Sequence, residues 1–134
     1  MGPVTETELI ARFILTRSHI NWESVEKPRL RPEAFMPHPR IELSVFRIGG
    51  LDQSEVNQIG GNVAALRQKT LIGHGQLSVK VVEQAKLSVR PKEPPPRHAD
   101  IVGWPAPTGN PKEDKSRQKL LAQELVERAV LILA

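Results

Sequence analysis

The chain has 134 residues, enough for one domain with a modest core, and it contains no cysteine. The missing cysteine excludes a disulfide framework, a thiolate metal site and a cysteine nucleophile. Apolar residues make up 39% of the chain and charged residues 25%, which favours a folded domain over a disordered segment, and the net charge is +4.

The same counts lead to three expectations. We expect a single domain over residues 1–134. We expect a cytoplasmic protein without membrane contact, because we find no apolar run long enough to span a bilayer and no signal-peptide pattern. The mild basic excess favours encounter with phosphate-bearing or acidic partners without requiring it.

The N-terminal part contains one ambiguous element and one irregular connection. The capping-box pattern TETE at residues 5–8 indicates a helix start, yet residues 9–16 fit either a helix or a strand. We expect a short helical turn that runs into a strand. Prolines recur between residues 27 and 40 and preclude regular structure there, so we expect an extended connection with Phe35 and Met36 as anchors.

A strand and a helix are predicted next. Residues 41–48 alternate apolar and polar side chains, which is typical of a strand whose second face is partly covered. Asp52, followed three residues later by a glutamate, predicts the start of a helix over residues 53–66. Gly60 and Gly61 weaken that helix and indicate a neighbour that packs where side chains would not fit.

A hairpin and a long connection are predicted after this helix. Apolar residues alternate over 77–81 and again over 87–89, and residues 83–86 fit a turn between two strands. The segment 91–111 holds seven of the 12 prolines, so we expect a stiff strap without ladder hydrogen bonds.

The last predicted element is a helix, and it completes the fold class. Asn110 can cap it, Pro111 suits its first position, and an apolar stripe continues over residues 112–133. We predict an α+β fold, in which a small antiparallel or mixed sheet carries two main helices, 53–66 and 112–133, on one face. The proline-rich strap would connect the hairpin to the last helix.

The strap contains a candidate binding segment. His98 and Asp100 would lie on one side of the extended chain and Arg97 on the other, followed by Trp104. One interpretation is that Trp104 anchors the strap in the core. The other is that Arg97, His98, Asp100 and Trp104 form a docking surface for a protein partner.

No complete catalytic motif is present. The four histidines lack the paired spacing of a zinc site, and neither Ser18 nor Ser44 lies in a nucleophile elbow. The two glycines of RIGGLDQSE lack the following lysine of a P-loop, and His74 in IGHGQ fits the tip of a surface turn. A catalytic site would therefore need basic residues from across the chain: Arg17, His19, Arg47, His74, Arg97 and His98.

We predict a small accessory or interaction module that binds a protein or a phosphate-bearing partner, with no cofactor and no metal. The first alternative is a small phosphate- or nucleotide-directed enzyme that uses His98 and Arg47. The second is a non-specific nucleic-acid-binding protein that contacts backbone phosphates, although aromatic residues for base stacking are scarce. The sequence leaves the oligomeric state open.

Overall fold

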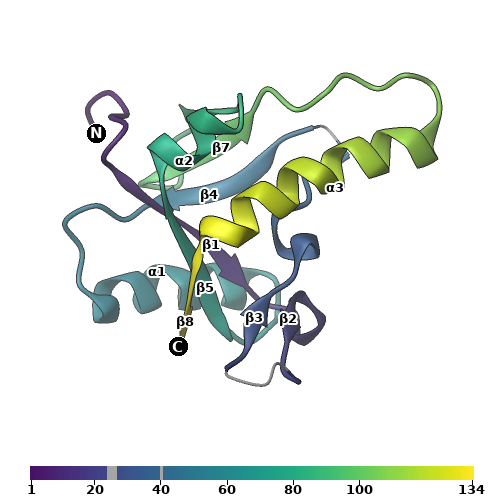
Figure 1. The fold of residues 1–134 in the computed structure, drawn as a ribbon. Coiled ribbons are helices and arrows are strands. Elements are labelled where there is room, and N and C mark those ends of the chain that lie inside the picture. The colour runs from purple at the N-terminus through teal and green to yellow at the C-terminus, as the bar shows by residue number, and fades with distance from the viewer. Residues whose placement is uncertain (24–26, 40) are drawn as a thin grey trace.

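The computed structural model describes residues 1–23, 27–39 and 41–134, which form an antiparallel sheet between helices (Figure 1). The strands are β1 (Leu9–Ile14), β2 (Ile20–Asn21), β3 (Arg29–Leu30), β4 (Leu43–Arg47), β5 (Gly73–Ser78), β6 (Ser88–Pro91), β7 (His98–Val102) and β8 (Val130–Leu133). The helices are α1 (Gln53–Leu66), α2 (Val79–Gln84) and α3 (Pro111–Arg128), with single 3₁₀ turns η1 (Arg17–His19) and η2 (Pro32–Phe35). The α+β class predicted from the sequence is confirmed.

Six strands form the main sheet in the order β6-β7-β4-β1-β5-β8, and every described pair is antiparallel. The N-terminal strand β1 lies near the centre, between β4 and β5. Strands β2 and β3 form a separate small ribbon that pairs Ile20 with Leu30.

The two long helices cover opposite faces of this sheet, not the single face expected from the sequence. Helix α1 packs through Val56 on the face that carries Phe13 and Phe46. Helix α3 packs through Ala122 and Leu125 on the other face, against the larger cluster that includes Phe35. Because β1 and β4 carry apolar side chains on both faces, each face needs its own cover.

Helix α1 has the predicted bounds and the predicted start. The Asp52 side chain accepts a hydrogen bond from the Glu55 N–H at 2.8 Å, and the Glu55 carboxylate accepts from the Asp52 N–H at 3.2 Å. A side chain at Gly60 would overlap Phe13, whereas Gly61 faces open space, so only the first glycine is required by a neighbour.

The predicted hairpin over residues 77–89 is wrong. Residues 79–84 form α2, whose N-cap Ser78 accepts a hydrogen bond from the Val81 N–H, and β6 pairs with β7 instead of β5. Val79 and Val82, three residues apart, are buried on one side of this short helix. Tertiary burial therefore outweighs the strand preference of its valines.

The prediction of a helix over residues 112–133 holds only as far as Arg128. Asn110 caps α3 by accepting hydrogen bonds from two backbone N–H groups, and Ala129 leaves the helical conformation. The following run VLIL forms β8, which pairs with β5 from Val130 to Leu133. The last apolar residues of the predicted helix, Val130–Leu133, therefore form an edge strand.

Both proline-containing connections contain regular structure that was not predicted. Segment 27–39 holds β3 and η2, with Phe35 fully buried, and residue 40 of the predicted connection lies outside the described residues. Segment 91–111 contains β7, which hydrogen-bonds to β4 on one side and to β6 on the other. The expectation of a segment without ladder bonds is therefore wrong at residues 98–102.

At the start of the chain, the expected strand is confirmed, and the segment before it forms a single hydrogen-bonded turn without a helix. The Glu8 N–H donates to the Thr5 carbonyl oxygen at 3.1 Å, and β1 begins at Leu9.

Candidate functional site

Arg47, at the end of β4, is held by the N-terminal segment. It is 2% exposed, and its Nε and Nη2 donate to the two carboxylate oxygens of Glu8 at 2.7 and 2.8 Å. Nη2 also donates to the Pro3 carbonyl oxygen. The hydrogen bond with Glu8 raises the pKa of Arg47. This guanidinium fixes residues 3–8 against the sheet.

His74 lies inside β5, not at the tip of a surface turn as predicted. It is 2% exposed, its ring meets Phe13 edge to face, and its Nε2 lies 3.3 Å from the Gln76 side-chain oxygen. Burial lowers the pKa of His74, so the neutral ring is favoured in the folded chain. Its position is that of a core residue.

Two members of the predicted binding segment also support the fold. Trp104 is 4% exposed, and its Nε1 donates to the Ile101 carbonyl oxygen at 3.0 Å. Arg97 donates through Nη1 to the Arg47 carbonyl oxygen at 3.1 Å. Trp104 therefore presents little surface to a partner.

The remaining predicted residues lie in different places. Arg17 is exposed and stacks over the Trp22 ring at 4.5 Å. His19 lines a small pocket beside the end of β1, and His98 and Asp100 line a larger cavity over β4 and β7. The six basic residues predicted from the sequence thus do not gather around one site.

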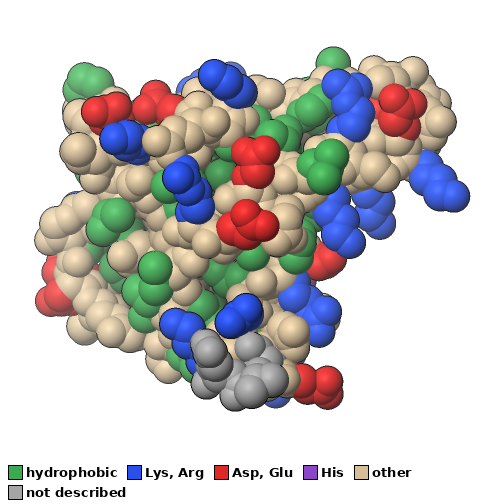
Figure 2. All heavy atoms as spheres, in the orientation of Figure 1, with side chains coloured by type: hydrophobic (Ala, Val, Ile, Leu, Met, Phe, Trp, Pro, Cys, Tyr) green, Lys and Arg blue, Asp and Glu red, His purple; other side chains and the backbone are tan. Residues whose placement is uncertain are grey.

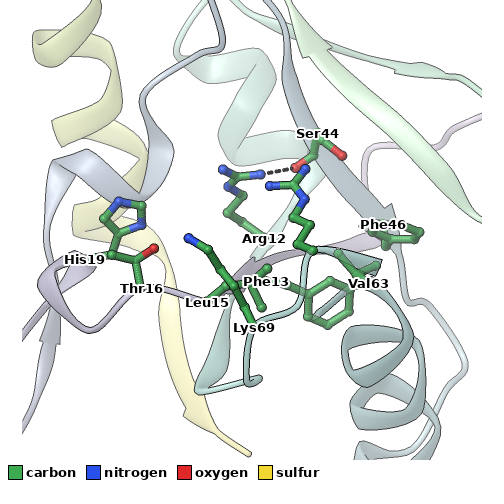
Figure 3. A pocket seen from close by; sticks show the side chains of 10 residues that line it. Arg12, Phe13, Leu15, Thr16, His19, Ser44, Phe46, Val63 and Lys69 are labelled. Atoms are coloured by element: carbon green, nitrogen blue, oxygen red, sulfur yellow. Dashed lines mark hydrogen bonds between the residues drawn. The ribbon is translucent and has the colours of Figure 1, made fainter. Parts of the chain in front are cut away.

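The small pocket has a volume of about 70 Å³ and is rich in cations (Figure 3). Arg12 of β1, His19 of η1, and Arg67 and Lys69 after α1 line it, together with Thr16 and Ser44. Within the part of the chain that the structure describes, no acidic side chain lines it. Figure 3 shows the Arg12, Lys69 and His19 side chains around the opening, with Phe13 and Val63 on the side of α1.

Arg12 is fixed in this pocket by the way in which β1 and β4 diverge. The two strands pair only at Ile10 with Arg47 and at Ala11 with Phe46. Beyond these pairs the Arg12 side chain bridges the gap, donating from Nη1 to the Ser44 carbonyl oxygen at 3.0 Å and from Nε to the Ala34 carbonyl oxygen at 3.1 Å. Two backbone acceptors therefore hold the guanidinium in place.

The electrostatics of the pocket are unbalanced. Burial, and secondarily the charge of Arg67, lowers the pKa of Arg12 to about 10. Burial, and then the charge of Arg12, likewise lowers the pKa of His19. The acidic residue that opposes this at His19 is Glu33, which lies 3.5 Å from Lys119 in an ion pair of its own. Among residues 1–23, 27–39 and 41–134, the pocket lining therefore carries no negative charge.

The neighbouring cavity has a volume of about 490 Å³ and shares Arg12, Ser44 and Arg67 with the small pocket. Across it, the Ser44 Oγ lies 2.7 Å from the His98 Nε2. On the β6 and β7 side, Lys92 contacts Asp100 at 3.2 Å and Glu42 at 3.4 Å. The contact with Asp100 raises the pKa of Lys92.

Sequence reasoning missed Arg12, Arg67 and Lys69 as a group. The available signal was the arginine within the apolar run LIARFI, because a charged residue at a half-buried strand position needs a specific partner. The proximity of Arg67 and Lys69 to it depends on where α1 ends against the sheet, which no local pattern encodes.

Within residues 1–23, 27–39 and 41–134, no group of three or more histidine, aspartate or glutamate side chains is arranged to hold a metal ion. None of the helices described is long and apolar enough to cross a bilayer. Comparisons of the chain with models of known families, with curated proteins and with solved structures find no match.

Proposed function

We propose that this protein is a binding module for a ligand that carries a phosphate or similar oxyanion, and that this group binds in the small pocket. The observation that supports this proposal is that Arg12, Arg67 and Lys69 line one cavity, and that none of its described lining residues is acidic. Like charges so placed repel one another, and a bound anion would remove that repulsion.

The donors in the pocket suit an oxyanion. Guanidinium groups present planar N–H donors that match phosphate and carboxylate oxygens, and Lys69 adds a point charge. Thr16 supplies a hydroxyl and His19 a ring nitrogen. A cavity holds one water in roughly 10–15 Å³, so about 70 Å³ accommodates a small oxyanion with its remaining hydration.

Two observations favour a small ligand over a nucleic acid strand or a protein surface. On the face that carries α3, basic and acidic side chains are interspersed, without a continuous basic track (Figure 2). The aromatic residue expected to anchor a protein partner, Trp104, is buried. Both observations favour the concave cationic pocket as the binding site, and therefore a small ligand.

Titration with inorganic phosphate tests the proposal. Arg67 and Lys69 are exposed rim residues, so their replacement by alanine should leave the fold intact. We expect phosphate to bind the wild type and raise its melting temperature at constant ionic strength, and the Arg67→Ala/Lys69→Ala variant to bind at least about tenfold more weakly.

The matched control is Lys80→Ala/Lys115→Ala, which also removes two exposed charges, from α2 and α3. This variant should bind phosphate like the wild type. Equal weakening in both double variants would mean that phosphate responds to net charge alone, and the pocket assignment would then be abandoned.

A further inference from the structure

Ser44 and His98 have the relative geometry of a nucleophile and its general base. They lie on the neighbouring strands β4 and β7, where Ser44 pairs with Asp100 and Phe46 pairs with His98. The Ser44 Oγ is 2.7 Å from the His98 Nε2. The Phe46 ring packs edge to face on the imidazole at 5.3 Å and limits its rotation.

A backbone carbonyl fixes the tautomer of His98. The other ring nitrogen, Nδ1, lies 2.8 Å from the Lys92 carbonyl oxygen, which can only accept a hydrogen bond. In the neutral ring Nδ1 therefore carries the proton, and Nε2 is left to accept the proton of the Ser44 hydroxyl. Nucleophile, base and a group that orients the base are the three parts of an activated serine.

The pair is reachable from solvent and lies next to the cations. Ser44 and His98 both line the cavity of about 490 Å³, and Arg12 and Arg67 line the same cavity. Because Arg12 donates to the Ser44 carbonyl oxygen at 3.0 Å, its guanidinium is held beside this serine. This fixed positive charge beside Ser44 would stabilise the oxyanion that forms when Ser44 attacks a carbonyl carbon.

Asp100 provides negative charge beside the same ring nitrogen of His98 that contacts Ser44. Its Oδ1 lies 3.8 Å from Nε2, and its Oδ2 lies 3.2 Å from the Lys92 ammonium. This carboxylate therefore lies near the positive charge that His98 would gain when it takes the proton of Ser44. We regard Asp100 as a positioning residue, since it acts through His98.

We propose that Ser44 and His98 hydrolyse a carboxylic ester that carries a compact anionic group. This inference rests on the proposed function: the anion would occupy the small pocket, and the ester carbonyl would lie over Ser44 in the adjoining cavity. Arg12, Ser44 and Arg67 line both spaces and so join the two parts of such a ligand.

The reaction balances with water as the second reactant. The Ser44 Oγ attacks the carbonyl carbon while its proton passes to the His98 Nε2, and the oxyanion faces the arginines. Collapse breaks the bond to the alcohol oxygen, which takes the proton from His98. Water then attacks the acyl-serine, gives a proton to His98, and releases the acid as the Ser44 Oγ recovers that proton.

Hydrolysis of the monoanionic p-nitrophenyl hydrogen succinate, compared with neutral p-nitrophenyl acetate, tests this inference. We expect the wild type to prefer the anionic ester, with inorganic phosphate as a competitive inhibitor. Ser44→Ala should reduce the rate of hydrolysis to that measured without protein, and His98→Gln should reduce kcat/KM by about 100-fold or more. Ser18→Ala, which removes an exposed serine beside His19, should hydrolyse both esters like the wild type.

Mass spectrometry after reaction with phenylmethylsulfonyl fluoride gives a second readout, with the adduct expected on Ser44. Wild-type turnover by Ser44→Ala, or no turnover by the wild type, overturns the inference. Phosphate binding to Ser44→Ala separates the two proposals. If the variant binds phosphate and the wild type cleaves neither ester, only the hydrolytic site fails; if the wild type cleaves esters without binding phosphate, the proposed function fails.

Discussion

Glu8 and Arg47 form a bidentate ion pair that is almost entirely shielded from solvent. The two carboxylate oxygens accept from Nε and Nη2 at 2.7 and 2.8 Å, and the side chains are 14% and 3% exposed. One residue precedes β1 and the other ends β4, so the pair closes one end of the central strand pair.

Removing the carboxylate should therefore be costly. Glu8→Ala leaves a buried guanidinium without its counter-charge, and we expect a loss of about 3–5 kcal/mol in the free energy of unfolding, measured by urea denaturation. Glu6→Ala, which removes an exposed carboxylate from the same segment, should change stability by less than about 0.5 kcal/mol. Similar effects of the two substitutions would contradict this account.

The two tryptophans should differ strongly in their contribution to stability. Trp104 is 4% exposed and Trp22 is 36% exposed. Trp104→Ala should cost roughly 3–5 kcal/mol through lost burial and a cavity, whereas Trp22→Ala should cost about 1 kcal/mol, mainly its contact with Arg17. Chemical denaturation of both variants measures this, and an unchanged midpoint for Trp104→Ala would show that the strap is not anchored by its indole.

Two glycines should respond to alanine with opposite sign. At Gly73 a methyl group would overlap the backbone of Ile132 in β8, so Gly73→Ala should destabilise the fold by roughly 1–3 kcal/mol. At Gly61, within α1, nothing lies within 4 Å of the added carbon, so Gly61→Ala should stabilise the protein by about 0.5–1 kcal/mol. Thermal unfolding of the pair provides the comparison.

Stability should fall as the pH drops below neutral, in part because of His74. Burial lowers its folded pKa below the ordinary value of 6.5, so the unfolded chain binds more protons under mildly acidic conditions. The stabilisation from a neutral His74 is complete above pH 6.5 and is lost as the pH falls, by at most about 1.4 kcal/mol per pH unit. His74→Gln should show a flatter profile between pH 7.5 and 5 than the wild type; an equally steep profile would contradict the assignment.

Elements with complete local signals could be predicted from the sequence. Helix α1 matched because Asp52 and Glu55 form a reciprocal cap that requires nothing beyond the segment itself. The predictions for residues 79–84 and 130–133 were wrong, because each segment is apolar enough to form either a helix or a strand. Neighbours decided between them: β5 pairs with the second segment, and burial of Val79 and Val82 selects a helix for the first.

The candidate site was less predictable for a related reason. The sequence indicates His98 as a candidate, whereas Ser44 lies in no nucleophile-elbow motif. Their contact depends on the pairing of β4 with β7, two strands separated by more than fifty residues. The sequence pattern indicates Arg12 only as part of residues 9–16, which fit either a helix or a strand. Its partners, the carbonyl oxygens of Ala34 and Ser44, come from two other elements.

The strand order also bears on how fast the chain folds. In the main sheet only β6 and β7 pair after a short connection. The central strand β1 pairs with β4 and β5, which lie much further along the chain, and β5 pairs with β8. Each of the other pairings must close a long stretch of chain before its hydrogen bonds and burial offset the lost entropy. Refolding after dilution from denaturant should accordingly take milliseconds to seconds, as in proteins dominated by non-local contacts, and not microseconds. During synthesis, β8 must emerge from the ribosome before it can pair with β5 and complete the main sheet, although β1 is the first strand of that sheet to be made.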